Sequence, residues 1–168
     1  MFRKLFLVLG LFLIASLSAR AQGITDKVEV FGGYTFENFG SSPSANLNGW
    51  ELAGQYKVTD WLGGVADFDG HYGSIAGTGT SVHSFLFGPQ VSWPARISPF
   101  AHVLVGGAHI SGGGASDTSF STALGVGIDA RLTHGFSWRV IQGDYVVTRF
   151  FGNTQNNARV STGIVFHF

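Results

Sequence analysis

The sequence contains no cysteine and few charged residues. Without cysteine no disulfide bond can hold the fold together, which suits an exported protein that relies on a closed ladder of backbone hydrogen bonds. Charged residues make up 12% of the chain, whereas soluble domains average about 25%. The composition therefore disfavours an ordinary soluble domain.

Long apolar runs and an excess of positive charge are also missing. Beyond the N-terminal region no stretch of about twenty apolar residues occurs, so no segment there is a candidate transmembrane helix. Ten Lys and Arg residues balance ten Asp and Glu residues. Loss of Arg3, Lys4 and Arg20 with a leader leaves seven against ten, a net charge of minus three. This charge excludes a strongly basic nucleic-acid-binding protein.

The N-terminal region has the three parts of a secretory signal peptide. Arg3 and Lys4 form a positive segment, residues 5–17 form an apolar core, and Ala19-Arg20-Ala21 provides a cleavage site between small residues. The apolar core is too short to cross a hydrocarbon layer of about 30 Å as a helix. We therefore expect residues 1–21 to be a cleavable signal peptide and residues 22–168 to form one domain.

The rest of the chain is rich in phenylalanine and glycine and alternates in polarity. Its 16 Phe residues are too many for one small core, whereas a barrel wall that faces lipid can display them. Short runs with a period of two are separated by Gly, Ser, Asn, Asp and Pro clusters, which predicts strands and turns. The predicted strands are 27–36, 48–59, 62–72, 81–93, 98–109, 119–132, 136–148 and 157–168. The expected fold class is all-β, an eight-stranded antiparallel up-and-down transmembrane β-barrel.

Connections of two lengths alternate along the chain. Longer segments rich in Gly, Ser and Asn follow the odd-numbered strands, and shorter segments follow the even-numbered strands. The longer segments are 37–47, 73–80, 110–118 and 149–156, and the shorter ones are 60–61, 94–97 and 133–135. Outer-membrane barrels have long extracellular loops and short periplasmic turns. We therefore expect four polar extracellular loops and both termini in the periplasm.

One face of each predicted strand is apolar, and the other carries small or charged residues. In the last strand Val160 and Ile164 lie on one face, whereas Arg159 lies on the other. A soluble barrel such as a lipocalin would put the apolar face inside, but it would need a more charged exterior. Because side chains just fill an eight-stranded barrel, we expect the small and charged face inside. The seventh strand breaks the pattern, which predicts a β-bulge near residues 142–143.

Three segments carry a family resemblance. They are Phe85-Leu86-Phe87-Gly88-Pro89-Gln90-Val91, Pro99-Phe100-Ala101-His102 and Val160-Ser161-Thr162-Gly163-Ile164-Val165-Phe166-His167-Phe168. These segments resemble the outer-membrane β-barrel family that includes opacity-type proteins and the N-terminal barrel of outer membrane protein A. The resemblance covers residues 28–168. It implies the fold and an outer-membrane location, and it implies little about activity.

The charged residues of the inward faces are the candidate site. Unpaired charges are costly in a narrow lumen, so we expect ion pairs and hydrogen bonds across the barrel. The predicted interior polar network consists of Glu51, Asp129, Arg131, Arg139, Asp144 and Arg159. Such a network either plugs the interior or forms a gated path for protons and small ions. We favour the plug because barrels of this size fill their interior with side chains.

Catalytic and metal chemistry have weaker support in the sequence. Asp67, Asp69 and His71 lie two apart and share one face of a strand, a pattern that also suits acid–base or metal chemistry. No nucleophile with a base and an orienting group can be assigned from the spacing. We therefore expect no enzyme activity, no metal and no cofactor.

The function that the sequence favours is a structural or surface-interaction barrel in the outer membrane, in contact with its lipid and lipopolysaccharide. A low-conductance porin-like channel is the alternative, and a lipid-modifying or proteolytic enzyme is a third hypothesis. Phe166 and Phe168 end the chain on alternating apolar positions, as outer-membrane barrels similarly do. This ending predicts a signal that the barrel-assembly machinery reads. The sequence identifies no extracellular ligand.

Overall fold

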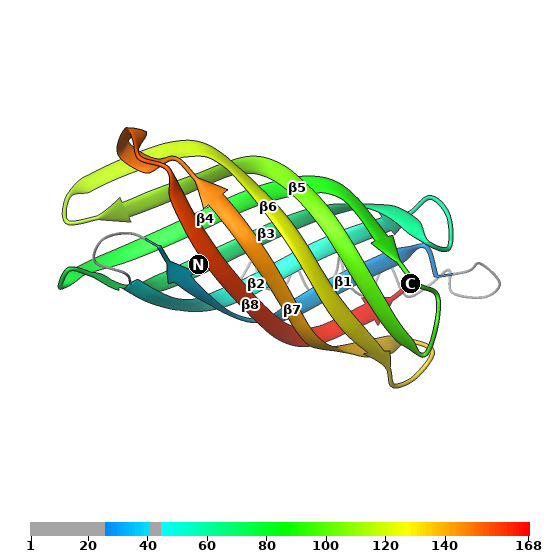
Figure 1. Ribbon diagram of the computed structural model, residues 1–168. Coiled ribbons are helices and arrows are strands. Elements are labelled where there is room, and N and C mark those ends of the chain that lie inside the picture. The colour runs from blue at the N-terminus through cyan, green and yellow to red at the C-terminus, as the bar shows by residue number, and fades with distance from the viewer. Residues whose placement is uncertain (1–25, 41–44) are drawn as a thin grey trace, which may run out of the picture.

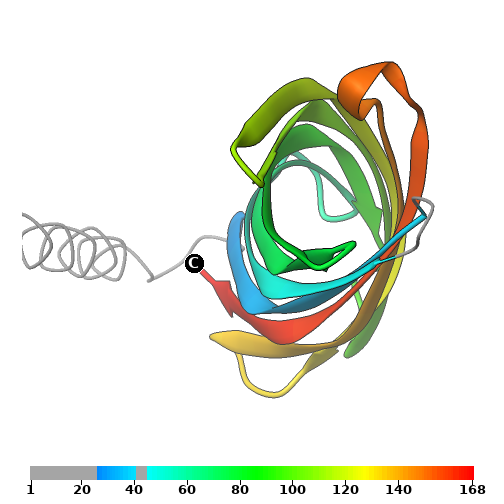
Figure 2. The same ribbon diagram turned by 90° about the vertical axis from the view of Figure 1, so that its left-hand side faces the viewer.

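The computed structural model describes residues 26–40 and 45–168, which form one closed β-barrel. Each strand pairs antiparallel with the next, and β1 pairs with β8 to close the ring, as Figure 1 and Figure 2 show. The strands are β1 (Val28–Phe39), β2 (Ala45–Lys57), β3 (Leu62–Ile75), β4 (Thr78–Ser92), β5 (Ile97–Gly112), β6 (Ala115–Arg131), β7 (Phe136–Thr148) and β8 (Gln155–His167). The predicted eight-stranded up-and-down barrel is confirmed. The predicted signal peptide, residues 1–21, lies outside the described residues.

Side chains alternate between the outer wall and the lumen along the strands, except at an irregularity in β7. Leu52 and Leu124 lie on the outer wall with 51% and 59% of their surface exposed. Glu51 and Asp67 point into the lumen and are buried. The predicted orientation, with large apolar side chains outside and charged ones inside, is confirmed.

Two of the four predicted extracellular loops are tight hairpin turns instead. Ala76-Gly77 joins β3 to β4, and Gly113-Gly114 joins β5 to β6. All four residues have φ between 50° and 82°, and a two-residue type I′ hairpin turn requires positive φ at both positions. The predicted loops 73–80 and 110–118 are therefore wrong. Their Gly, Ser and Thr residues extend the strands beyond the apolar part. Backbone hydrogen bonding continues there because it needs no apolar side chains.

The two ends of the barrel differ in their connections. At one end lie the two hairpin turns, the end of β1, the start of β2, and residues 149–154, which include the 3-10 helix η2 (Phe150–Gly152). We call this the η2 end. At the other, the C-terminal end, residues 58–61, 93–96 and 132–135 form connections of four residues each. Among the described residues no helix is long and apolar enough to cross a membrane.

The seventh strand contains the irregularity that its sequence pattern predicts. The register between β7 and β8 shifts between Arg139 and Gln142. Val140 and Ile141, which lie between them, are both exposed on the outer wall, at 37% and 49%. The bulge is therefore at 140–141, slightly earlier than predicted, and it brings Gln142 onto the inward face with Arg139.

Candidate functional site

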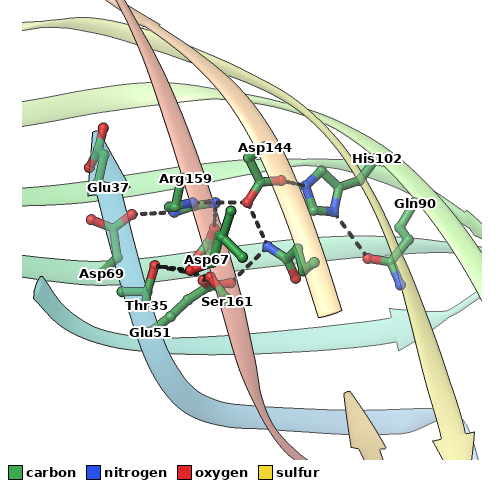
Figure 3. Close-up of polar contacts among 12 residues, drawn as sticks. Thr35, Glu37, Glu51, Asp67, Asp69, Gln90, His102, Asp144, Arg159 and Ser161 are labelled. Carbon is green, nitrogen blue, oxygen red and sulfur yellow. Dashed lines mark hydrogen bonds and ion pairs between the residues drawn. The ribbon is translucent and has the colours of Figure 1, made fainter. Parts of the chain in front are cut away.

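The guanidinium group of Arg159 lies at the centre of the lumen and contacts three carboxylates. Arg159 comes from β8, Asp67 and Asp69 come from alternate inward positions of β3, and Asp144 comes from β7. Its Nη2 lies 2.7 Å from Asp67 Oδ2, its Nη1 2.5 Å from Asp69 Oδ2, and its Nε 2.9 Å from Asp144 Oδ2 (Figure 3). The Arg159 side chain is 1% exposed. One buried cation therefore joins opposite walls of the barrel.

An amide and a hydroxyl extend these contacts to Glu51 of β2. Gln142 Nε2 donates to Glu51 Oε1 over 3.0 Å and to Asp144 Oδ2 over 2.8 Å. Ser161 Oγ donates to the other oxygen of Glu51 and lies 3.0 Å from Thr35 Oγ1. The neutral side chains of Gln142 and Ser161 thus donate hydrogen bonds to carboxylate oxygens that no second cation reaches. These bonds lower the cost of burying the carboxylate charges.

Arg139 forms a second cationic centre towards the C-terminal end. Its Nε and Nη2 donate to the two oxygens of Asp129 over 2.9 and 3.1 Å, and its Nη1 donates to Gln142 Oε1 over 2.7 Å. The guanidinium carbon also lies 4.4 Å from the ring centre of Phe31 and 4.3 Å from that of Phe100. Two aromatic rings therefore pack against the guanidinium while its nitrogen atoms are hydrogen-bonded.

Two buried histidines complete the cluster. His102 Nε2 lies 2.7 Å from Asp144 Oδ1. His71 Nδ1 lies 3.1 Å from Asp69 Oδ1 and 3.2 Å from Glu37 Oε2. We call the whole set the polar network; it comprises Thr35, Glu37, Glu51, Asp67, Asp69, His71, Gln90, His102, Asp129, Arg139, Gln142, Asp144, Arg159 and Ser161.

The structure brings together five of the six residues that the sequence assigned to the interior network. Glu51, Asp129, Arg139, Asp144 and Arg159 all lie in the polar network. Arg131 does not. It is the last residue of β6, its side chain is 43% exposed, and its Nη2 lies 3.5 Å from Asp26 Oδ2 at the C-terminal end. This placement corrects the assignment, because a residue at the end of a strand lies at the mouth of the lumen, where its side chain is open to solvent.

Sequence reasoning missed Glu37, Gln142 and Ser161 as members of the network. Glu37 fell in a predicted loop, although β1 continues to Phe39. With the bulge predicted near 142–143, the alternation places Gln142 on the outward face. A bulge at 140–141 places it on the inward face and would have identified it as a network residue.

The η2 end of the lumen is filled by apolar side chains. Phe39, Leu47 and Phe150 are each at most 1% exposed. We call this set the apolar cluster; it comprises Phe39, Ala45, Leu47, Val82, Ala108, Ile110 and Phe150. At the C-terminal end the lumen is polar again. There Glu29 forms an ion pair with Lys57, and its Oε1 lies 2.9 Å from His167 Nδ1.

The connectivity of one group resembles a catalytic triad. Thr35 Oγ1 lies 3.3 Å from His71 Nε2, and His71 Nδ1 lies beside Asp69. All three residues are at most 1% exposed, so a substrate has no access to the hydroxyl group. Within residues 26–40 and 45–168, moreover, no group of three or more His, Asp or Glu side chains is positioned to hold a metal ion.

The two residues of the predicted assembly signal lie where β8 meets β1. Phe166 is 47% exposed on the outer wall. The backbone N–H of Phe168 donates to Val28 O over 2.8 Å, and the N–H of Val28 donates to Phe168 O over 3.2 Å. The seam of the barrel therefore extends to the last residue of the chain.

Solved structures with a similar fold include outer-membrane β-barrels. Neisserial surface protein A, from Neisseria, matches over 88% of this chain and 100% of its own with a TM-score of 0.69 and 14% identity. Ail of Yersinia pestis matches over 86% and 100% with a TM-score of 0.60 and 16% identity. The N-terminal β-barrel domain of OprF from Pseudomonas aeruginosa matches over 85% and 98% with a TM-score of 0.52 and 12% identity.

No family model and no curated protein sequence matches the chain. At 12–16% identity the solved structures establish the fold alone. The protein has the fold of the eight-stranded outer-membrane β-barrels, and the resemblance predicted from its sequence is confirmed at this level.

Proposed function

We propose that the protein is an integral outer-membrane protein with a structural or surface-interaction role. The observation that carries this proposal is the distribution of polarity, because large apolar side chains cover the outer wall and the charges lie inside. In water such a wall would be exposed, whereas in a bilayer the hydrocarbon covers it and the closed ladder leaves no unpaired strand edge. The fold likeness to outer-membrane barrels supports the same location.

The proposed orientation puts the η2 end outside the cell and both termini in the periplasm. Aromatic side chains are exposed near both ends of the wall, as expected for residues at the two membrane interfaces. They are Tyr34, Tyr72 and Phe120 towards the η2 end, and Trp61, Trp93 and Trp138 towards the C-terminal end. The predicted signal peptide supports export, since a chain that crosses the inner membrane N-terminus first reaches the outer membrane from the periplasm.

We further propose that the lumen is plugged and does not conduct ions. The polar network and the apolar cluster occupy it in succession, and Arg159 and Phe150 at their centres are at most 1% exposed. In planar-bilayer recordings, the refolded protein is expected to insert without discrete current steps. A porin recorded in the same membrane shows that openings are detectable. Discrete, reproducible openings of the wild-type protein would support the porin-like channel instead.

A polyanion is not the surface ligand that we propose. The structure of Ail has been solved in complex with the heparin analogue sucrose octasulfate. In this chain the segments at the η2 end, residues 37–50, 70–84, 107–120 and 146–158, contain one Lys or Arg residue, Arg149. Electrostatic attraction to a sulfated chain needs several cations. Any surface partner would therefore be recognised through hydroxyl, amide and aromatic groups.

Phe168 has a proposed role in assembly as well as in the wall. Its backbone pairs with Val28 at the seam, and an open seam in hydrocarbon leaves backbone groups without partners. Deletion of Phe168 is expected to reduce the folded protein in the outer membrane, measured as the compact band that migrates faster on a gel before boiling. A normal amount of this band after the deletion would show that Phe168 is dispensable for assembly.

A further inference from the structure

A serine, a histidine and a glutamate form a chain of polar contacts at the C-terminal end of the lumen. Ser137 Oγ lies 2.7 Å from His167 Nε2, and His167 Nδ1 lies 2.9 Å from Glu29 Oε1. Both distances fall within the range of about 2.6–3.2 Å that joins a nucleophile, its base and the group that orients the base. In serine hydrolases the same order of groups activates the hydroxyl, because the histidine accepts its proton and the carboxylate holds the ring.

The backbone register holds these three residues on neighbouring strands. Glu29 of β1 and His167 of β8 are cross-strand partners at the seam, and Ser137 of β7 pairs with Val165, two residues before His167. Glu29 also forms an ion pair with Lys57, and this opposite charge stabilises its carboxylate. The three side chains are therefore brought together only when β8 pairs with both of its neighbours.

The chain of contacts borders a cavity that reaches the surface, unlike the triad-like group in the polar network. Ser137, His167 and Glu29 all line this space, whose volume is about 80 Å³. Pro94, in the exposed 93–96 connection, lines it as well, so the space opens at the mouth of the lumen. In the proposed orientation a small molecule in the periplasm therefore has a route to the Ser137 hydroxyl.

Two further groups on this cavity can stabilise negative charge that develops next to Ser137. Arg131 is the cross-strand partner of Ser137 and lines the same cavity. Its side chain is 43% exposed, and its contact with Asp26 is a long one of 3.5 Å. The Ser92 hydroxyl also lines the cavity, and it is buried without a hydrogen-bond partner among the described residues. A cation and a hydroxyl donor are therefore available to an oxyanion.

We propose that this site is an esterase centre that hydrolyses short-chain acyl esters of polar alcohols, acetyl esters above all. Ser137 and His167 are the catalytic residues, and Glu29 is a positioning residue. A polar cavity of about 80 Å³ holds an acetyl group but not a long apolar chain. An adjoining cavity of about 210 Å³, which shares Arg131 and also includes Lys27, holds the polar alcohol. The inference goes beyond the structural role proposed above and departs from the sequence-based expectation of no enzyme activity.

The proposed reaction needs water as its only co-reactant. Ser137 Oγ attacks the ester carbonyl carbon while its proton passes to His167 Nε2, and the negative oxygen of the tetrahedral intermediate is stabilised by Arg131. The bond to the alcohol oxygen breaks, and the alcohol leaves with the proton from His167. Water then attacks the acyl-serine and gives a proton to His167. The carboxylic acid is released as this proton returns to Ser137 Oγ.

Hydrolysis of 4-methylumbelliferyl acetate by the refolded barrel in detergent tests the activity. The wild type is expected to show saturable hydrolysis, at least about tenfold faster than with the decanoate ester. Ser137→Ala and His167→Asn are each expected to lower kcat/KM about 100-fold or more. Thr35→Val is the matched control, because it removes the hydroxyl of the inaccessible triad-like group and should retain activity. Equal rates for the wild type and Ser137→Ala, or equal losses in Thr35→Val and Ser137→Ala, would overturn the proposal.

A fluorophosphonate probe tests the nucleophile without any substitution. The oxygen of an activated serine bonds to phosphorus and displaces fluoride, which leaves a stable adduct. Mass spectrometry of the digested wild-type protein is expected to locate this adduct on Ser137 and not on Ser92 or Ser98, which line the same cavity. Folded wild-type protein in which Ser137 stays unlabelled would contradict its role as a nucleophile.

Arg131 and Glu29 have different expected effects. Arg131→Gln is expected to lower kcat about tenfold or more with little change in KM, because the guanidinium acts on charge that develops in the transition state. Glu29→Gln is expected to lower kcat/KM and to move its rise with pH to lower pH, because the protonated imidazole of His167 loses its carboxylate partner. The other charged groups on the cavity, Lys57, Asp129 and Arg131, are unchanged in this variant.

An unchanged pH profile in Glu29→Gln would show that Glu29 does not act through His167. Gel migration before boiling is measured for every variant, so that only folded barrels are compared. A folded wild-type barrel that neither hydrolyses the ester nor reacts with the fluorophosphonate contradicts this inference and leaves the proposed function intact.

Discussion

The middle of the lumen and its η2 end both contain buried apolar side chains, but the middle also contains a network of buried charges. The middle contains the polar network, in which Arg159 joins three carboxylates from two other strands. The η2 end contains the apolar cluster, in which Phe150 is fully buried. Hydrogen bonds fix positions through direction, whereas apolar side chains fix them through volume.

The difference follows from what encloses each part. In the middle only strands surround the lumen, and a side chain can meet partners from facing walls at fixed heights. At the η2 end the connection between β7 and β8 supplies Phe150 from η2, which packs among inward apolar side chains. A barrel of this size can therefore be filled by apolar residues where a connection adds a buried ring, and it needs paired polar residues where its own inward faces are charged.

The largest expected effect comes from removing the central cation. Arg159→Ala leaves Asp67, Asp69 and Asp144 buried without their shared partner, and breaking a buried charge network in this way costs about 3–5 kcal/mol. Urea titration of the refolded barrel in lipid vesicles measures this loss of unfolding free energy. A loss below about 1 kcal/mol would show that water or protons replace the guanidinium at little cost.

Truncation in the apolar cluster should cost less. Phe150→Ala leaves a cavity at the η2 end, for which we expect a loss of about 3 kcal/mol in the same titration. Phe151→Ala is the control, since Phe151 is 58% exposed and its truncation creates no cavity. Equal losses for the two variants would mean that the backbone of η2, and not the buried ring, stabilises this end.

The smallest effect should come from the one predicted network residue that lies at the mouth of the lumen. Arg131 pairs with Asp26 at an exposed site, and exposed ion pairs contribute at most about 1 kcal/mol. Arg131→Ala is therefore expected to change the unfolding free energy by about 0.5 kcal/mol or less. A loss approaching that of Arg159→Ala would put Arg131 back into the interior network.

Alternation in the sequence was sufficient to predict the strands, their order and the face that each presents to the lumen. The alternation was not sufficient to predict which residues pair with the inward charges. The sequence suggested Glu51, Asp129 and Asp144 as partners for the arginines, and Arg159 also contacts Asp67 and Asp69 on a strand that is not its neighbour. Contacts across a lumen depend on strand tilt and relative height, which a period of two does not specify.

Composition also failed to predict the ends of strands whose backbone pairing continues beyond their apolar residues. Segments 73–80 and 110–118 have the Gly, Ser and Thr content of loops, yet they form paired strands up to the pairs Ile75–Thr78 and Gly112–Ala115, on either side of a two-residue turn. In a strand that leaves the hydrocarbon region, backbone pairing continues while the selection for apolar side chains ends. Loop length at membrane interfaces is therefore overestimated from composition.

The seam between β1 and β8 has a consequence for the kinetics of folding. It pairs residues that are far apart in the sequence, such as Glu29 with His167. Folding rates fall as contacts become less local. The ring cannot close until β8 is available to pair with β1, and until then the open edge of β1 favours aggregation. A chain of this fold is therefore prone to aggregate until the seam has closed.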